Sequence, residues 1–179
     1  MLAYKGFKPD LTCRGYQFDD RHVNCTDKAT CVQCGFHAAE NPLDCFTYYP
    51  NLKSSVYYLV DCRGDVHEDG SDTKIACTEI KLIRRLSLSD MLLHALIYMS
   101  KHPQRKNNNR VQTESGIAFD GFTVVRGMYP RARGEKVGDI LALAQEDESH
   151  NIISINVFKL DGKRFKAGVW YDVKGEVRK

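Results

Sequence analysis

Four side chains between residues 25 and 37 could bind one metal ion. Cys25, Cys31, Cys34 and His37 follow the spacing Cys-x5-Cys-x2-Cys-x2-His, with His22 and Cys45 as spare ligands. Zinc takes four such thiolate and imidazole ligands in a tetrahedral arrangement, and Cys-x2-Cys lets one turn supply two thiolates. The alternative is that these are small buried residues of a reduced protein, because free cysteine is among the most buried residue types. A structural zinc site is therefore one of two interpretations.

Clusters of Lys and Arg follow one another in the second half of the chain. They comprise Lys101, Arg105, Lys106 and Arg110, then Arg126, Arg131, Arg133 and Lys136 around Tyr129, and finally Lys163, Arg164 and Lys166. Basic residues with interleaved aromatic residues suit phosphate backbones and single strands of nucleic acid. The alternative is an ordinary solvated surface of loops and turns. The pattern predicts contact with nucleic acid, or with a partner that itself binds nucleic acid.

Charge and cysteine content divide the chain into two halves. All seven cysteines lie between positions 13 and 77. Residues 1–80 carry 8 Lys/Arg and 12 Asp/Glu, a net charge of −4, whereas residues 81–179 carry 18 and 11, a net charge of +7. Such asymmetry often marks a chain that meets a charged partner with one end. We expect a Cys-containing N-terminal α+β domain over residues 1–103 and a basic, β-rich C-terminal extension over residues 104–179.

The hydrophobic pattern predicts one main helix over residues 87–102, because apolar residues recur there at helical spacing. A short helix is expected over 41–46, with Asn41 as N-cap and Pro42 at its first position. Strands are expected over 2–7, 16–18, 56–62, 74–86, 116–119, 122–125, 139–144, 152–160 and 168–173. We expect a loop over 19–33, turns at 64–65 and 69–72, and a hairpin turn at Asp161-Gly162. The predicted fold class is α+β, with an antiparallel or mixed sheet.

Composition excludes several classes of protein. The chain is 42% hydrophobic and 27% charged, close to the average of soluble globular proteins. No apolar run approaches the roughly 18–20 residues that span a bilayer, so we expect no membrane contact. The odd number of cysteines and the absence of an apolar export signal predict a reducing cytoplasm.

Several strings of residues have a familiar order. They are Tyr4-Lys5-Gly6-Phe7, Leu11-Thr12-Cys13-Arg14-Gly15-Tyr16, and above all Gly35-Phe36-His37-Ala38-x-Glu40-Asn41-Pro42-Leu43-Asp44. They resemble a family of uncharacterised bacteriophage and prophage proteins, named only as a domain of unknown function. Many relatives insert repeats that form a β-solenoid before the C-terminal end. Here only Thr123-Val124-Val125-Arg126-Gly127 with Gly134 resembles one such turn. The resemblance implies a phage setting and no particular activity.

A weaker resemblance points to an enzyme. The order of a Tyr-Lys-Gly strand, a Gly-Phe-His-Ala turn and an aromatic strand is similar to small ADP-ribosyltransferases. Those enzymes clamp NAD between an early strand and a Gly-aromatic turn, and use a late Glu to stabilise the ribose cation. The residues that would serve are Lys5 or Arg14, His37, Tyr48 or Tyr49, and Glu79. No triad stands at the expected spacing. The alternative is that Gly35 supplies a special backbone angle and His37 binds a backbone carbonyl.

Three functions follow from these patterns. The first is a phage accessory protein in the host cytoplasm that binds and blocks a host macromolecule, either a protein or a protein–nucleic acid complex. Counter-defence, such as anti-CRISPR-like inhibition of a nuclease complex, is its most concrete form. The second is an NAD-dependent transferase, and the third is direct binding of nucleic acid. We favour the first, and a protein without catalysis, because it requires the least unobserved geometry.

Overall fold

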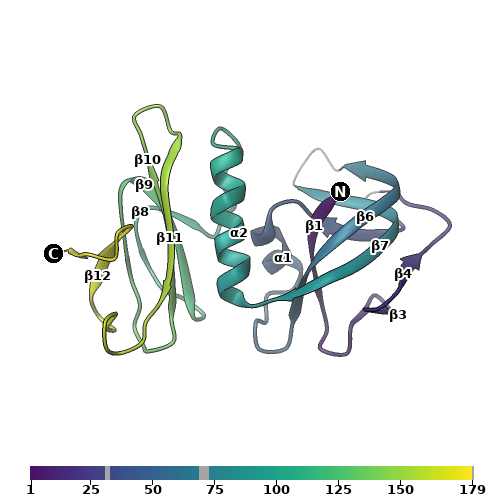
Figure 1. Ribbon diagram of the computed structural model, residues 1–179, viewed down its shortest axis with the longest axis horizontal. Helices are drawn as coiled ribbons and strands as arrows, with labels where there is room; N and C mark the ends of the chain where they lie inside the picture. The colour runs from purple at the N-terminus through teal and green to yellow at the C-terminus, as the bar shows by residue number, and fades with distance from the viewer. Residues whose placement is uncertain (31–32, 69–72, 179) are drawn as a thin grey trace. The chain divides into compact units, whose positions relative to one another are not determined.

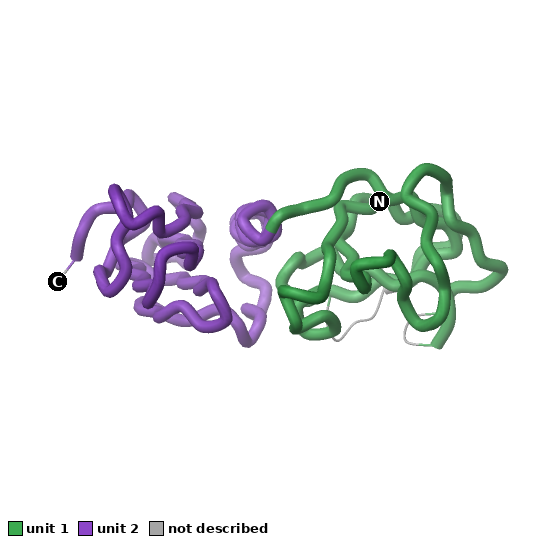
Figure 2. Tube along the Cα trace, turned by 90° about the horizontal axis from the view of Figure 1, so that it is seen from below, with its two compact units in different colours: residues 1–87 green, residues 88–179 purple. Residues whose placement is uncertain are grey.

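The computed structural model describes residues 1–30, 33–68 and 73–178, and it divides into two compact units, residues 1–87 and 88–179 (Figure 2). The boundary precedes the main helix, α2 (Leu88–Lys101), whereas the sequence placed it after residue 103. The helix belongs to the C-terminal unit because its apolar face packs on the strands β10 (Ile140–Glu146) and β11 (Ile152–Lys159). Helical periodicity shows which face is buried but does not show which sheet buries it.

The new boundary also weakens the predicted contrast in charge. Residues 1–87 carry 11 Lys/Arg and 12 Asp/Glu, and residues 88–179 carry 15 and 11. The net charges of the two units are therefore −1 and +4, compared with −4 and +7 for the halves divided at residue 80. Three basic residues of a strand in the N-terminal unit account for the difference: Lys81, Arg84 and Arg85.

The N-terminal unit is built around a small closed antiparallel barrel. Its strands are β1 (Leu2–Phe7), β5 (Phe36–Ala39), β6 (Val56–Glu68) and β7 (Lys74–Leu86). Pairing runs β7-β5-β1-β6 and closes through β6 with β7. Figure 1 labels β1, β6 and β7 of this barrel. The strand β4 (Val23–Cys25) pairs with β7 beyond the end of β5. A separate hairpin of β2 (Thr12–Cys13) and β3 (Tyr16–Gln17) follows β1.

One seam of this barrel is nearly open. β1 and β6 pair along the whole of β1, from Leu2 opposite Asp61 to Phe7 opposite Val56. β1 and β5 pair at a single position, where Tyr4 lies opposite Ala39. The two strands therefore separate beyond this pair, and their backbone groups cannot form a continuous ladder of hydrogen bonds there.

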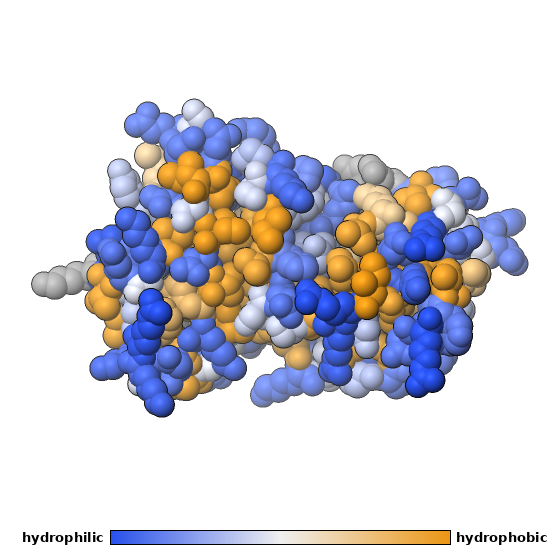
Figure 3. Space-filling model, in the orientation of Figure 1, coloured by the Kyte–Doolittle hydropathy of each residue, from blue (hydrophilic) through white to orange (hydrophobic). Residues whose placement is uncertain are grey.

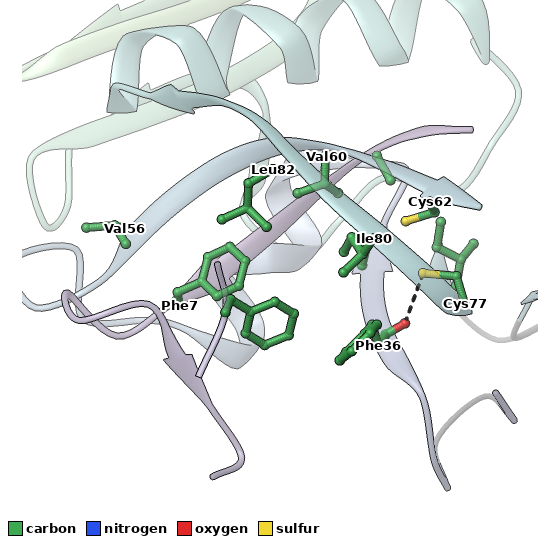
Figure 4. Packing of buried hydrophobic residues seen from close by; sticks show 12 residues of the cluster. Phe7, Phe36, Val56, Val60, Cys62, Cys77, Ile80 and Leu82 are labelled. Carbon is green, nitrogen blue, oxygen red and sulfur yellow. Dashed lines mark hydrogen bonds between the residues drawn. The ribbon is translucent and has the colours of Figure 1, made fainter. Parts of the chain in front are cut away.

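The core of the N-terminal unit lies inside the barrel (Figure 4). Because side chains alternate between the two faces of a strand, every second residue of β1 and β5 points inward. Phe7 and Phe36 both approach Phe18, with ring centroids 5.0 and 5.1 Å apart in edge-on geometry. The thiol of Cys77 donates to the carbonyl of Phe36 at 3.5 Å. Full burial of each such aromatic side chain stabilises the fold by about 1.5–3 kcal/mol.

The short helix α1 (Pro42–Tyr48) forms as its sequence predicts. The Oδ1 atom of Asn41 accepts a hydrogen bond from the amide of Leu43 at 3.1 Å, which satisfies one of the unpaired amides of the first turn. Pro42 follows at the first helical position. The helix packs against β1 and β5 and buries Leu43 and Phe46. Its end therefore places Tyr48 and Tyr49 beside the open seam.

Two local predictions for this unit are wrong. The expected turn at 64–65 is a bulge inside β6, where Gly64 has φ 69° and the Asp65 amide donates to Thr78 Oγ1 at 3.0 Å. The hydrogen bond to β7 holds the extra residues in the strand, so the chain does not reverse. The expected loop over 19–33 contains β4, which forms only because β7 offers it a partner. The turn expected at 69–72 lies outside the described residues.

The C-terminal unit begins with α2, whose bounds confirm the predicted helix. Met91, Leu92, Ala95, Leu96 and Met99 are buried along one face. Beyond it, β8 (Val111–Ile117), β9 (Phe122–Arg133) and β10 pair in parallel, although no helix connects them. Val111 lies opposite Val124, and Phe122 lies opposite Ile140. Val111 and Val124 are 13 residues apart in the sequence, and Phe122 and Ile140 are 18 apart, so short connections join these parallel strands. The resemblance of residues 123–127 to a solenoid turn stays a prediction.

The expected hairpin at Asp161-Gly162 is wrong in its pairing. A turn does form, because Gly162 has φ 76° and the Asp161 carboxylate accepts from the Phe165 amide at 2.9 Å. However, β11 pairs with β10, whereas β12 (Trp170–Asp172) pairs with β9 and with β13 (Val177–Arg178). β10 covers β9 only as far as Gly127, so the rest of that edge is available to β12.

The molecule is thus mostly β-sheet, with two helices among the described residues. The N-terminal sheet is antiparallel and the C-terminal sheet is mixed. The predicted α+β class holds in this coarse sense, with less helix than the name suggests. No helix within the described ranges is both long and apolar enough to cross a membrane.

Candidate functional site

A pocket of about 490 Å³ opens where β1 and β5 separate. Its walls come from these two strands, the β2–β3 hairpin and the end of α1. Six aromatic rings contribute to the lining: Tyr4, Tyr16, Phe18, Phe36, Tyr48 and Tyr49. This volume and this aromatic lining are typical of sites that bind small molecules.

Lys5 lies at the centre of the open seam. Its side chain is only 5% exposed, and its ammonium lies 5.3 Å from the ring centroids of both Phe7 and Phe18. The Nζ atom donates to the carbonyl oxygen of His37 at 2.6 Å, so it bridges β1 and β5 where their ladder ends. Among the described residues, no carboxylate pairs with this ammonium. Burying a charge without a counter-ion costs several kcal/mol. The pocket therefore contains a buried ammonium that has no carboxylate partner within the described ranges.

The other charged groups of the lining are also cations. Arg14 is exposed at the tip of the β2–β3 hairpin, where Arg14 and Gly15 have φ 50° and 84°, as a two-residue hairpin turn requires. Lys74 lies with its ammonium 4.6 Å from the ring centroid of Tyr48. Together with Lys5, these are all the charged residues of the lining that the structure describes. The pocket is therefore electropositive.

The positive charges of the lining affect the pKa of His37. Burial lowers the pKa of its imidazole below the ordinary value of 6.5, and the charges of Lys5, Arg14 and Lys74 lower it further. A hydrogen bond to the backbone of Gly35 acts in the opposite direction. The imidazole is therefore neutral at physiological pH, and a bound anion would raise its pKa.

The floor of the pocket contains a thiol. The hydroxyl of Tyr49 donates to Cys13 Sγ at 2.9 Å, and the ammonium of Lys5 lies 3.7 Å from the same sulfur. Burial and then the contact with Cys13 raise the pKa of Tyr49 above its ordinary value. Gly6 allows this arrangement, because a Cβ atom there would lie 2.5 Å from the Tyr49 ring. Sequence reasoning included Tyr49 but missed Cys13 and Gly6, which become neighbours only when the β2–β3 hairpin folds over β1.

The structure brings together most of the residues that the enzymatic reading named. Lys5, Arg14, His37, Tyr48 and Tyr49 all line the pocket. Glu79 does not, because it lies on β7 opposite Cys25 of β4 and Arg63 of β6. The described lining contains no carboxylate that could stabilise a ribose cation.

The described residues of the predicted zinc site lie on different elements. Cys25 is exposed on β4, Cys34 is exposed in the following loop, and His37 lines the pocket. Cys31 lies outside the described residues. Of the spare ligands, His22 contacts Asp19 at 2.8 Å, and burial raises the pKa of Cys45 to about 12. Within the described ranges, no group of three or more His, Cys, Asp or Glu side chains is placed to hold a metal ion. Zinc stays a prediction, which metal analysis of the purified protein can test.

The residues of the predicted basic clusters differ in how far they are buried. Arg126 is 5% exposed and pairs with Glu146 at 2.9 Å, while its other donors reach the carbonyls of Pro103 and His150 and the side chain of Asn107. Its place among partner-binding residues is therefore wrong, because it holds the C-terminal unit together. The remaining residues are half-buried (Arg110, Arg131 and Arg133) or exposed (Lys101, Arg105, Lys106, Lys136, Lys163, Arg164 and Lys166).

Comparison with known proteins covers the N-terminal unit. The family model described as a domain of unknown function, DUF7666, matches residues 1–94. This range contains every residue of the pocket lining and the start of α2. No curated protein and no solved structure is significantly similar to the chain.

Proposed function

The chain belongs to the DUF7666 family, and we propose that its N-terminal unit binds a small anionic ligand of the nucleotide class in the pocket between β1 and β5. The buried ammonium of Lys5 carries this proposal. It is 5% exposed, it has no carboxylate partner within the described ranges, and it lies among aromatic rings. An anion that enters the pocket would supply the charged partner that this ammonium lacks among the described residues.

The chemistry of the lining favours a phosphate joined to a planar ring. Hydrogen bonds between ammonium or guanidinium groups and phosphate oxygens are short and strong, and Lys5, Arg14 and Lys74 can supply them. The tyrosine and phenylalanine rings provide faces and edges on which a nucleobase can pack. A ligand with both parts would neutralise the cations and bury its ring.

Calorimetric titration of the full chain with AMP, adenosine and inorganic phosphate tests this proposal. We expect AMP to bind at least about tenfold more tightly than either of the other two, because only AMP has both parts. The double variant R14A/K74A should weaken AMP binding. R21A/K28A is its matched control, because it removes two exposed cations of the same unit that do not line the pocket. Equal binding of adenosine, or equal losses in the two variants, would refute the proposal.

ADP-ribosyl transfer from NAD would use the same pocket, but it also requires a catalytic carboxylate. The pocket contains His37 and the two tyrosines, but Glu79 lies elsewhere on β7. We therefore expect NAD to bind without transfer or hydrolysis. Labelled NAD incubated with the protein and a cell lysate tests this expectation. Product formation that disappears in E79Q or H37Q would establish turnover instead of binding alone.

Docking to a host macromolecule is a second candidate, and one observation favours it. The C-terminal unit exposes large apolar side chains, including Phe119 at 77%, Tyr129 at 80% and Ile153 at 61%. On the face shown in Figure 3, hydrophobic residues gather over β11, the strand that carries Ile153. Inhibition of a host complex by a phage protein would use such a surface.

A comparison of two baits can test this docking proposal. The intact protein should retain a host complex that I153D loses, and only the intact protein should inhibit that complex. Because Ile153 is 61% exposed, the substitution leaves the fold in place. Inhibition by both proteins to the same extent would contradict docking through this surface.

A further inference from the structure

A second concave site lies in the C-terminal unit. It is a groove of about 590 Å³ between the middle of β9, the end of β10 and the β12–β13 hairpin. Its lining includes Tyr129, Pro130, Arg131, Gln145, Lys174 and Arg178. All of these residues lie beyond the range matched by the family model, so the groove is independent of the pocket in the N-terminal unit.

Tyr129 presents its ring to solvent at the edge of the groove. Its side chain is 80% exposed. Its backbone is held in place, because the amides of Met128 and Tyr129 donate to the two carboxylate oxygens of Glu114 at 2.7 and 3.0 Å. An exposed aromatic ring on a fixed backbone is an element on which an unpaired base can stack.

The groove is positively charged. Three cations (Arg131, Lys174 and Arg178) and one carboxylate (Asp172) line it, which gives a local charge of +2. Asp172 is already satisfied, because it accepts from the amides of Lys174 and Glu176 at 2.9 Å and from Nε of Arg178 at 2.8 Å. The guanidinium of Arg131 lies 5.0 Å from the ring of Trp170, which holds it at the surface of the sheet. The groove therefore presents a net positive charge to an approaching anion.

We propose that this groove binds single-stranded nucleic acid, with one base stacked on Tyr129 and the adjacent phosphates paired with Arg131 and Lys174. A cationic groove beside an exposed aromatic ring is how proteins hold unpaired strands without sequence preference. The sequence pattern predicted nucleic-acid contact from three clusters of basic residues. The structure narrows this prediction to one groove and leaves Lys101, Arg105 and Lys106 outside it.

Fluorescence anisotropy with a labelled oligothymidine and the full chain tests the proposal. We expect Y129A to bind about tenfold more weakly and Y129F to bind normally, because stacking needs the ring and not the hydroxyl. R131A/K174A should bind more weakly, and its slope of log affinity against log salt should be shallower by about 1.4, which corresponds to two phosphate contacts. Since Tyr129 is largely exposed, Y129A keeps the fold, which the fluorescence of Trp170 can verify.

Two controls make the result specific to the groove. K101A/K106A removes the same net charge from exposed positions of the same unit and should bind the oligonucleotide normally. K5M should also bind it normally, so a failure of the nucleotide pocket would not be mistaken for a failure of the groove. No binding by the intact chain, equal weakening in K101A/K106A and R131A/K174A, or tighter binding of a poly-glutamate peptide than of the oligonucleotide would each overturn the proposal.

Discussion

Replacing Lys5 by Met should separate the two reasons for which a protein could bury a lysine. Met has a similar length and no charge, so it can fill the same space between the rings of Phe7 and Phe18. If Lys5 serves to bind an anion, the substitution should weaken binding and leave the fold intact. If Lys5 serves as a strut between β1 and β5, the substitution should weaken the fold.

The structure sets the size of the expected change in stability. The ammonium forms one strong hydrogen bond, to the carbonyl of His37, worth about 1.5–3 kcal/mol. Its contacts with two aromatic rings contribute about 1–2 kcal/mol each in a desolvated setting. Removing the ammonium from water costs several kcal/mol. These contributions nearly cancel, so we expect the free energy of unfolding of K5M to lie within about 2 kcal/mol of that of the intact protein.

Urea unfolding should be followed by a probe that reports the N-terminal unit. The only tryptophan, Trp170, lies in the C-terminal unit, so its fluorescence does not report the β1–β5 seam. Tyrosine fluorescence is suitable, because six of the nine tyrosines lie in residues 1–87. F7A is a useful comparison, because deleting a fully buried aromatic side chain should cost about 3–5 kcal/mol. In calorimetry, K5M should bind AMP at least about tenfold more weakly, the value of one charge-assisted hydrogen bond.

One pattern of results would refute this reasoning. If K5M is destabilised as much as F7A and still binds AMP with normal affinity, then Lys5 is a structural link between the strands and the pocket does not need its charge.

Three further predictions follow from the same geometry. Because the pKa of His37 is lowered in the folded protein, the unfolded chain takes up the proton first, and the free energy of unfolding should decrease as pH falls below about 6.5. H37Q should make this pH dependence weaker in urea titrations. The affinity for AMP should instead rise toward low pH, because a phosphate favours the protonated imidazole. R126M should lower the stability of the C-terminal unit by about 3–5 kcal/mol, measured by Trp170 fluorescence, because the largely buried carboxylate of Glu146 would lose its guanidinium partner and keep only its contact with His150 among the described residues. G6A should displace the Tyr49 ring and lose about 1–3 kcal/mol in thermal unfolding together with AMP binding, whereas unchanged binding would show that Tyr49 is not part of the site.

Sequence reasoning succeeded where the signal was local. The helix over 88–101 follows from its own periodicity, and α1 from the Asn41-Pro42 start. The strand over 74–86 matches its prediction at both ends because it alternates and is bounded by polar residues. In each case the residues that determine the element lie within it.

The failures all concern pairing between distant residues. The bulge at Gly64 depends on Thr78 of the neighbouring strand, and the pairing of β12 depends on where β10 stops along β9. Arg126 looked like a surface cation because no local pattern reveals that Glu146, on the following strand, becomes its partner. A composition that changes along the chain likewise could not show that α2 packs on the C-terminal sheet.

The candidate site could be predicted only in part. The Gly-Phe-His string and Lys5 marked two of its walls, but nothing in the sequence shows that β1 and β5 pair at a single position. Arg14-Gly15 between two short polar-aromatic runs was a readable hairpin signal, and it would have placed Cys13 and Tyr16 on neighbouring strands. Glu79 was chosen for its late position in the sequence, and its register on β7 places it away from the pocket.

Hydrogen–deuterium exchange of the full chain, with and without saturating AMP, would locate the binding site without any substitution. A ligand held between β1 and β5 should slow exchange in residues 4–7, 13–16 and 36–39, and leave the C-terminal unit unchanged. Unchanged exchange in these three segments, or protection confined to residues 88–179, would contradict a nucleotide pocket at the open seam of the barrel.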